Sequence, residues 1–253
     1  MVLLRIFVYM KFHVVTLFPE SFSSYLNESI LARAQKNKLI DFKFYNPRGF
    51  VKPTKVQTKK DKPYLRVDEK PYGGGPGMLI QAEPMLKALT FIKNKIEKAQ
   101  KNKVEAKKGG VQHNAKNKIK IIHLSPSGKK FTNTYASSVA KKYDHVIIVC
   151  GRYEGIDARV KKIFKGDELS IGDYVLTGGE LAALVMIDTI SRQVKGVLGN
   201  HDSVEEMRNA SPDVYTRPEV LVFNGKKYKV PVVLLSGNHA KIEEWRAKQA
   251  KKF

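Results

Sequence analysis

Polar and charged side chains gather in one stretch of the chain, where glycines interrupt two apolar runs. The segment 145–160, HVIIVCGRYEGIDARV, ends an apolar run in a glycine turn that carries Arg152 and Glu154. The segment 169–180, LSIGDYVLTGGE, repeats the pattern with three glycines. Glycine allows backbone conformations and close approaches that other residues exclude, so such turns can bring main-chain N–H and C=O groups against a ligand. The stretch therefore predicts a ligand-binding site.

The chain lacks the motifs of several common enzyme classes. It contains no GxGxxG after a strand pattern, no GxxxxGKS or GxxxxGKT loop, no HExxH and no GxSxG. We therefore do not expect dinucleotide reduction, P-loop phosphoryl transfer or serine hydrolysis. The six histidines are scattered without metal-ligand spacing, and the single cysteine, Cys150, excludes a disulfide framework. A buried free thiol fits a reducing, cytoplasmic location.

The charge of the chain points to a polyanionic partner. It has 46 Lys and Arg against 24 Asp and Glu, a formal net charge of +22. Such a surplus is typical of proteins that bind nucleic acid, although a general bias toward lysine is an open alternative. No run reaches the about 18 apolar residues of a membrane helix. Residues 1–9 are apolar but lack a cleavage site, and we expect them to be an extension before a strand near Met10.

The elements that would position the glycine turns follow a strand–helix–strand order. Alternating or continuous apolar runs predict strands over 12–17, 39–45, 119–124 and 145–149. Periodic spacing predicts helices after Pro19, over 82–101, from Thr132 or Asn133, and over 180–192. This order indicates an α/β fold with a parallel sheet, whose ligand sites lie beyond the carboxyl ends of the strands. The sequence SPSG and the first glycine turn both follow predicted strands there.

Four other segments lie outside this strand–helix–strand order. The segment 46–78 is long and basic and ends in PYGGGPGM, which predicts a shaped loop near a ligand. The segment 102–118 is rich in lysine and predicts a solvated surface insertion. Residues 200–214 are polar and predict a linker, and 215–253 predict a small β-rich unit with a final basic helix capped by Asn238. That unit is short for a core of its own.

A series of motifs then connects the whole chain with one family. In chain order they are TLFPESF at 16–22, KPYGGGPGM at 70–78, HLSPSGKK at 123–130, CGRYEGIDARV at 150–160, SIGDYVLTGGELAAL at 170–184, GVLGN at 196–200, YTRPEV at 215–220 and LLSGNHAKIEEWR at 234–246. Together they resemble the bacterial tRNA (guanine-N1)-methyltransferases of the SPOUT superfamily. The resemblance implies a SPOUT-type parallel sheet with a deep trefoil knot over 1–199, the linker 200–214, and a short, truncated C-terminal tRNA-binding domain over 215–253.

The resemblance also implies the substrates. The methyl donor is expected to be S-adenosylmethionine, and the acceptor is N1 of the tRNA guanosine immediately 3′ of the anticodon, with another guanosine before it. The positions that match the family's cofactor site are Leu124, Ser125, Pro126, Gly151, Tyr153, Glu154, Ser170, Ile171, Gly172, Asp173, Tyr174, Val175, Leu176, Gly178 and Gly179. Glu154 is expected near the cationic sulfonium or the methionine amine, or in a salt bridge with a lysine. Mg²⁺ is a further expected cofactor, with unknown ligands.

Catalysis requires that the N1 proton of guanine be removed, because the neutral ring nitrogen has no free lone pair. A carboxylate should accept this proton and a cation should stabilise the charge that develops on O6. Arg192 matches the family's catalytic arginine, although a cation at a helix end is also a common stabilising feature. The family's linker aspartate has no clear counterpart, because the two ways of counting reach Met207 or Ser203. Either Glu206 or Asp202 could then supply the base.

The sequence therefore leaves two alternatives beside the tRNA methyltransferase. A knotted RNA-binding relic without a catalytic base is one, and a related methylase of ribosomal RNA is the other. The resemblance further implies a homodimer in which the linker acid of one subunit meets the cofactor of the other.

Overall fold

The computed structural model describes residues 9–53, 65–105, 118–198 and 213–249. Its contacts divide the chain into two compact units, Met1–Val197 and Leu198–Phe253, which are treated separately below. Residues 1–8, most of the predicted lysine-rich insertion and nearly all of the predicted linker lie outside the described ranges. The predicted domain boundaries therefore stay predictions.

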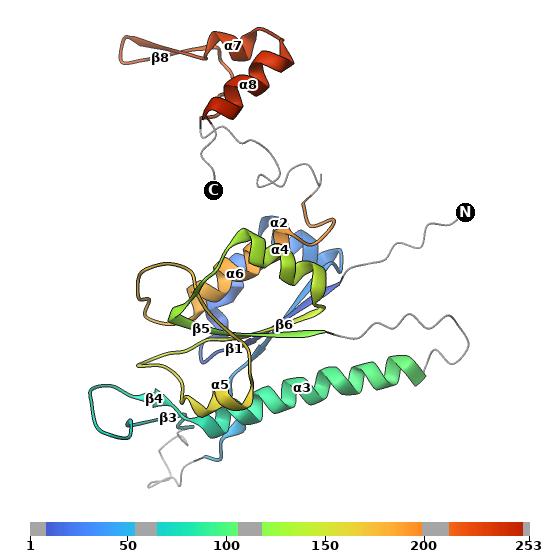
Figure 1. Ribbon diagram of the computed structural model, residues 1–253, viewed down its shortest axis with the longest axis vertical. Helices are drawn as coiled ribbons and strands as arrows, with labels where there is room; N and C mark the ends of the chain where they lie inside the picture. The colour runs from blue at the N-terminus through green and yellow to red at the C-terminus, as the bar shows by residue number, and fades with distance from the viewer. Residues whose placement is uncertain (1–8, 54–64, 106–117, 199–212, 250–253) are drawn as a thin grey trace. The chain divides into compact units, whose positions relative to one another are not determined.

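The first unit is built on one parallel sheet of five strands (Figure 1). The strands are β1 (Met10–Val15), β2 (Ile40–Tyr45), β5 (Ile119–Lys130), β6 (His145–Val149) and β7 (Asp167–Ser170). Their order across the sheet is β2-β1-β6-β5-β7, and every neighbouring pair is parallel. The predicted α/β class and parallel sheet are confirmed.

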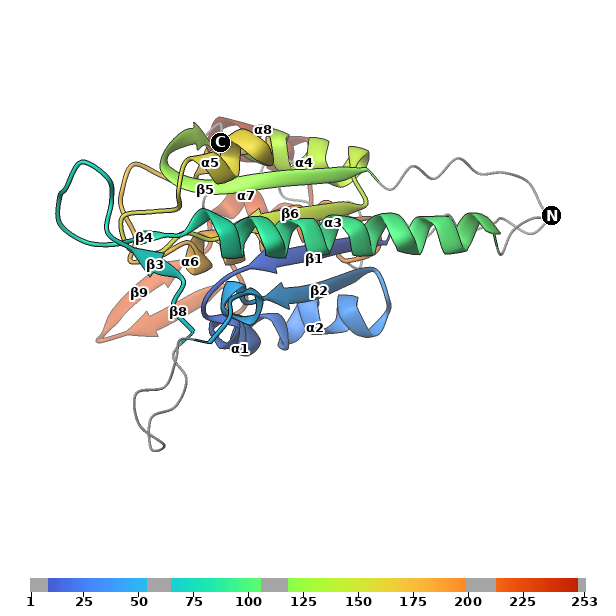
Figure 2. The ribbon, with the colours of Figure 1, turned by 90° about the horizontal axis from the view of Figure 1, so that it is seen from below.

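Helices cover both faces of this sheet. The helices α2 (Ser29–Lys36), α4 (Asn133–Lys142) and α6 (Glu180–Arg192) lie on one face, and α3 (Ala82–Glu105) and α5 (Arg159–Ile163) lie on the other (Figures 1 and 2). In β6, Val146 and Ile148 belong to the core on the first face, while Ile147 and Val149 belong to the core on the second. A strand that is apolar on both sides is therefore the reason that 145–149 reads as a continuous apolar run.

Two elements differ from the sequence-based expectation. The helix expected after Pro19 is broken into a 3-10 turn η1 (Pro19–Phe22), α1 (Ser23–Leu26) and α2, with Ser29 at a positive φ of 50°. The strand expected to end at Leu124 continues to Lys130, with a register shift that lets residues 125–128 bulge opposite Leu169. The bulge packs closely against β7, because a Cβ on Gly128 would lie 2.6 Å from the Leu169 nitrogen and only glycine fits.

The glycine-rich loop 71–78 is tied at its end to the turn after β6. The short strands β3 (Asp68–Glu69) and β4 (Leu79–Ile80) pair antiparallel and close the loop. The Glu154 N–H then donates to the Met78 carbonyl at 3.0 Å, and the Ile80 N–H donates to the Gly155 carbonyl at 2.9 Å. The end of the loop therefore lies beside the first glycine turn, while its predicted role near a ligand stays a prediction.

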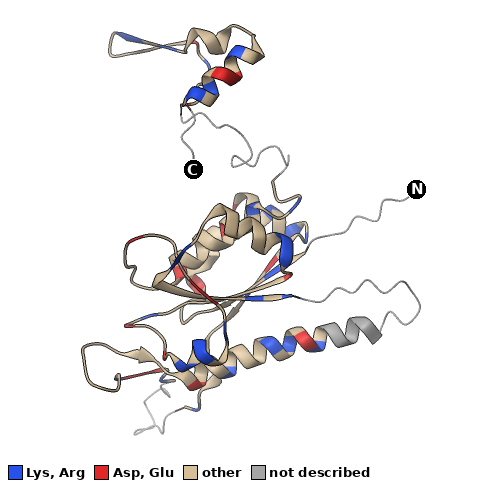
Figure 3. Ribbon diagram, in the orientation of Figure 1, with Lys and Arg blue, Asp and Glu red and all other residues tan. Residues whose placement is uncertain are grey.

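The second unit is a hairpin followed by two helices. It contains β8 (Val220–Phe223), β9 (Lys226–Lys229), α7 (Val232–Leu235) and α8 (His239–Gln249). The Asn238 side chain accepts a hydrogen bond from the Lys241 N–H at 3.1 Å, so the predicted cap is confirmed. None of the described residues 213–249 is buried, and blue basic segments lie along its hairpin and helix in Figure 3. Across all described ranges, no helix has the length and apolarity to cross a membrane.

Candidate functional site

The carboxyl ends of β5, β6 and β7 surround a cavity of about 250 Å³. Each strand contributes the turn that follows or interrupts it, and these are the turns that the sequence singled out. The predicted residues that line the cavity are Leu124, Ser125, Pro126, Gly151, Tyr153, Glu154, Ser170, Ile171, Tyr174, Val175, Leu176, Gly178 and Gly179. Gly172 and Asp173, also predicted, do not line it. A parallel sheet is expected to carry its ligand site at this edge.

One wall of the cavity is made by backbone packed directly on backbone. The Gly179 N–H donates to the Gly151 carbonyl at 2.9 Å, and a Cβ on Gly179 would lie 2.8 Å from the Cα of Cys150. Such a distance is shorter than any ordinary carbon contact, so residue 179 has room for glycine only. The buried Cys150 thiol beneath it has a pKa raised well above its usual range, chiefly by burial. The wall therefore presents peptide groups to the cavity.

The turn after β7 is closed by its own side chains. The Ser170 hydroxyl donates to the Gly172 carbonyl at 2.8 Å, and the ring of Tyr174 covers Gly172 where a Cβ would otherwise stand. Gly172 therefore shapes the turn from outside the cavity. The Asp173 carboxylate is 98% exposed and lies 3.9 Å from the Lys130 ammonium group. It faces solvent, and this explains why it takes no part in the lining.

The turn after β6 carries Glu154 against the glycine-rich loop. Tyr153 has a positive φ of 59° and Gly155 a φ of 126°, so the turn reverses the chain sharply. A Cβ on Gly77 would lie 2.6 Å from the Cγ of Glu154, which means that the glutamate side chain packs over that glycine. Among the described residues, Glu154 makes no ion pair within 4.0 Å with a lysine. The salt bridge considered from the sequence is therefore absent from this part of the chain.

A buried ion pair supports the wall from behind. The Nε of Arg152 donates to the Glu180 carboxylate at 2.8 Å, and the Thr16 hydroxyl donates to its other oxygen at 2.7 Å. The Glu180 side chain is only 5% exposed. Because Glu180 begins α6, its charge also lies at the favourable positive end of the helix dipole. The end of β1, the first glycine turn and α6 are thus joined by one carboxylate.

Several lining residues were not among those expected to bind the cofactor. They are Gly155, Leu169, Thr177 and Ala182, together with Arg152, which the sequence analysis had placed in the ligand turn. Arg152 and Gly155 stand inside the motif that predicted the site, so their position in the turn was the available signal. Glu180 had no such signal, because the first residue of an amphipathic helix is usually exposed.

The predicted catalytic Arg192 is not part of this lining. It ends the 13-residue helix α6, whose first residue Glu180 lies behind the cavity wall, so about 18 Å of helix separates the two positions. Near Arg192, the Tyr25 hydroxyl donates to the Asp188 carboxylate at 2.6 Å. This hydrogen bond raises the pKa of Tyr25, and the charge of Arg192 opposes the rise. Arg192 is therefore grouped with Tyr25 and Asp188 at the far end of α6.

The two predicted bases, Glu206 and Asp202, lie outside the described residues. No group of three or more histidine, cysteine, aspartate or glutamate side chains in the described ranges could hold a metal ion. The predicted Mg²⁺ therefore finds no ligand set in this part of the chain.

Three buried polar rings on the α3 face form a separate network. His13 is hydrogen-bonded to the Tyr45 hydroxyl at 3.1 Å and to His145 at 2.9 Å. Burial, and then the neighbouring His145, lowers the pKa of His13 to about 3. These rings lie among the strands and are not part of the cavity lining.

Comparison with known proteins connects this arrangement with a single family. Residues 10–252 match the family model of the tRNA (Guanine-1)-methyltransferase TrmD. The tRNA (guanine-N(1)-)-methyltransferase of Blochmanniella pennsylvanica is 42% identical over 241 residues, which cover 94% of this chain and 82% of that protein. The enzyme of Campylobacter jejuni subsp. doylei is 43% identical over 237 residues, 92% of this chain and 88% of that protein. That of Clostridioides difficile is 41% identical over 245 residues, with 95% and 92% covered.

Proposed function

The chain belongs to the tRNA (guanine-1)-methyltransferase family, and from this premise we propose that the cavity beyond β5, β6 and β7 holds its methyl donor. The activity of the family is methylation of guanine N1 in tRNA, and methyltransferases of this kind use S-adenosylmethionine. That donor supplies a methyl group activated by a sulfonium cation. The observation that carries the proposal is the convergence of three glycine-containing turns on one cavity.

The residues around the cavity fit this donor. An adenine ring needs hydrogen-bonding partners along one edge, and we propose that they come from the backbone of the lining turns 151–155 and 174–179, beside the hydrogen bond that joins Gly179 to Gly151. Apolar side chains such as Leu124, Ile171 and Leu176 supply surface for the flat ring. The Glu154 carboxylate lies in the same lining and brings a negative charge toward the positively charged end of the ligand. In this proposal the backbone binds the adenine base, and the Glu154 carboxylate attracts the positively charged end of the donor.

The acceptor we propose is the guanosine immediately 3′ of the anticodon, preceded by a second guanosine. The net charge of +22 supports a polyanionic substrate. In the second unit, Lys226, Lys227, Lys229, Lys241 and Lys248 give the exposed surface a basic character (Figure 3). We propose that this unit, together with Lys251 and Lys252, contacts tRNA phosphates.

The protein's part in the reaction is to move one proton and to stabilise one charge. A carboxylate from the linker, Glu206 or Asp202, takes the N1 proton of guanine, and the ring nitrogen then has the lone pair that would bond to the methyl carbon. The bond from that carbon to sulfur would break at the same time, so that the donor would leave as the neutral thioether. Arg192 donates hydrogen bonds to O6, where negative charge develops as the proton leaves. No step is assigned to Mg²⁺, because the described residues offer it no ligand set.

A homodimer with a shared site fits the separation of these groups. About 18 Å of helix lies between the cavity wall and Arg192, which is too far for both to reach one guanine from the same subunit. The outer side of α6 also exposes Leu181 by 57% and Val185 by 40%, and the nearby Val175 by 81%. A second copy that covers these apolar side chains would bring its own Arg192 and linker to the cavity.

The trefoil knot belongs to the same proposal. The order of the family motifs along the chain supports it, as does the pairing of β7 with β5, which brings the last glycine turn back beside the first strand of the site. A knot in this region would hold the three turns together against local opening.

The function is tested by methylating a tRNA transcript that carries two guanosines at the proposed site. Incubation with S-adenosylmethionine should yield N1-methylguanosine in that tRNA and none in ribosomal RNA. Replacing the acceptor guanosine by adenosine should abolish the product. Donor binding without N1-methylguanosine would contradict catalysis and favour the RNA-binding relic, and methylation of ribosomal RNA alone would favour the other alternative.

The shared site is tested with mixed dimers. The Arg192→Ala variant and the cavity variant Gly179→Val should each lack activity when alone. When both are refolded together, the mixed dimers contain one site with an intact cavity and an intact partner arginine. Activity should then return to about a quarter of the wild type, since half of the dimers are mixed and each has one complete site. No recovery would mean that Arg192 acts in its own subunit.

A further inference from the structure

Two arginines meet on one exposed aromatic ring beside the cavity. Phe18, which follows β1, is 42% exposed. The Cζ atom of Arg152 lies 4.5 Å from the centre of its ring, and the Cζ atom of Arg48 lies 5.8 Å from the same centre. The two guanidinium groups are therefore within about 10 Å of each other. Cations over a ring face are attracted by its electron density, so Phe18 helps to hold both.

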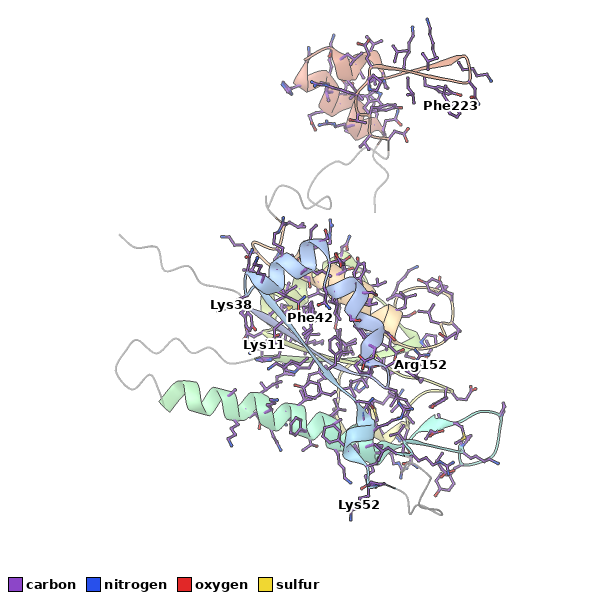
Figure 4. The ribbon with its side chains drawn as sticks, turned by 180° about the vertical axis from the view of Figure 1, so that it is seen from behind. Lys11, Lys38, Phe42, Lys52, Arg152 and Phe223 are labelled. Atoms are coloured by element: carbon purple, nitrogen blue, oxygen red, sulfur yellow. The ribbon has the colours of Figure 1, made fainter. Side chains whose placement is uncertain are left out.

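Each arginine is anchored by a second contact. Arg152 gives its Nε to Glu180 and its Nη1 to the Thr177 carbonyl, while its Nη2 has no hydrogen-bond partner among the described residues. Arg48 belongs to the 3-10 turn η2 (Pro47–Phe50) and donates its Nη1 to the Leu17 carbonyl at 3.2 Å. Side chains fixed in this way lose little conformational entropy when a ligand binds. Figure 4 shows Arg152 next to the segment that follows β1.

The charges around the ring do not cancel. Glu180 compensates Arg152, but Arg48 makes no ion pair with a carboxylate in the described ranges. One positive charge is thus left at an exposed aromatic ring whose other arginine lines the cavity. Guanidinium groups bind phosphate through two parallel hydrogen bonds, and they are the preferred side chains for that purpose.

We propose that Phe18, Arg48 and Arg152 form a clamp for a phosphodiester of the tRNA loop, next to the guanine that is methylated. The inference rests on the proposed function, because it takes tRNA as the substrate and the cavity as the donor site. Arg48 binds the phosphate, Arg152 adds its free Nη2, and Phe18 keeps both guanidinium groups in place. The clamp fixes the strand at the mouth of the cavity, so that the base can enter.

The test is tRNA binding without methylation, followed as a function of salt. Arg48→Gln should raise the Kd for tRNA about threefold to tenfold and lower the slope of log Kd against log salt by about 0.7, the value for one phosphate contact on a single strand. Arg33→Gln, an equal change of charge at an exposed position of α2, is the matched control and should change the slope less. Phe18→Leu should weaken binding by about twofold to fivefold.

A modified RNA sharpens this test. An anticodon stem–loop with neutral methylphosphonate links beside the acceptor guanosine should bind the wild type more weakly than the unmodified stem–loop does. The same links should weaken binding to Arg48→Gln clearly less, because only the Arg152 contact is then left to lose. If the losses of binding free energy caused by Arg48→Gln and by the methylphosphonate links simply added, the clamp would be overturned, because independent groups give additive effects. So would a salt slope for Arg48→Gln equal to that for Arg33→Gln.

Titration with S-adenosylmethionine is the check on folding, since Arg48 lies outside the cavity lining and its variants should bind the donor as the wild type does. Arg48→Lys is the second variant, which should keep the wild-type slope while it weakens binding. A reduced slope for Arg48→Lys would also overturn the proposal. Normal tRNA binding by a wild type that forms no N1-methylguanosine would instead count against the proposed function and leave the clamp supported.

Discussion

The two compact units of this chain are stabilised in different ways. The first has buried cores on both faces of its sheet, and at the cavity its backbone packs on backbone at Gly179 and Cys150. The second has no buried residue in 213–249, and Phe223 and Tyr228 of its hairpin are exposed by 63% and 54% (Figure 4). A substituted side chain in the core of the first unit therefore has to fit among packed neighbours. A substituted side chain in residues 213–249 is mostly surrounded by water. The first unit thus has a core of its own, whereas residues 213–249 of the second unit show none.

The sharpest test of this difference is to remove the buried carboxylate. Glu180→Ala leaves the Arg152 guanidinium without its partner behind the cavity wall. Breaking a fully buried ion pair costs about 3–5 kcal/mol. The Arg152 side chain is 25% exposed, so the loss here should be smaller, but the first unit should still unfold at lower urea concentration. Circular dichroism follows this unit, while fluorescence of Trp245, the single tryptophan, reports on the second. If the urea midpoint from tryptophan fluorescence fell as much as the midpoint from circular dichroism, the two units would not be stabilised independently.

Acid should also act on the first unit. Burial holds the pKa of His13 at about 3, below the 6.5 of an exposed histidine, so the unfolded chain binds a proton that the folded chain refuses. This contribution to stability is complete above about pH 6.5 and is lost as the pH falls toward about 3, by up to about 1.4 kcal/mol per pH unit. Unfolding in urea between pH 7 and 4 measures it. His13→Gln should flatten this dependence, because the group whose pKa changes on folding is then absent.

Replacing a glycine by alanine should weaken ligand binding only where the added methyl group has no room. Gly179→Ala places a Cβ 2.8 Å from the Cα of Cys150, while Gly49 has no atom within 4 Å of the same position. Overpacking of this kind costs about 1–3 kcal/mol and moves the wall, so the affinity for S-adenosylmethionine should fall tenfold or more. Gly49→Ala should bind as the wild type does in the same calorimetric titration. Equal affinities for the two variants would mean that the backbone around residue 179 can move to accommodate the added methyl group.

The smallest effect is expected on α8. Glu243→Gln removes the exposed ion pair with Arg246, whose atoms lie 2.8 Å apart. Exposed pairs of this kind contribute less than about 0.5 kcal/mol, so Trp245 fluorescence should give an unfolding midpoint close to that of the wild type. A large shift would show that the second unit depends on its surface charges for its own stability.

The sequence predicts the sheet and its functional edge because both depend on local patterns. The apolar run 145–149 and the glycines after it are enough to predict a buried strand that ends in a ligand turn. Most of the cofactor residues expected from the family motifs then line one cavity. Gly172 differs, because its role is to accommodate the Tyr174 ring, and that contact cannot be read from spacing alone.

Long-range contacts are what the sequence does not predict. The hydrogen bond between Thr16 and Glu180 joins residues 164 positions apart, and no periodicity encodes it. The bulge opposite Leu169 likewise arises when two distant segments meet at Gly128. The linker base stays a prediction for a different reason, since Glu206 and Asp202 lie outside the described residues and counting from either side leads to different positions.

The burial of Cys150 gives this protein a built-in chemical reporter. It is the only cysteine in the chain, its side chain lies beneath Gly179, and burial keeps its thiol protonated. Alkylating reagents attack thiolates that they can reach, so they will modify only those molecules in which the turn over Cys150 has lifted. The rate of labelling therefore measures how often this turn opens, and slower labelling in the presence of a ligand measures how strongly that ligand stabilises the closed turn.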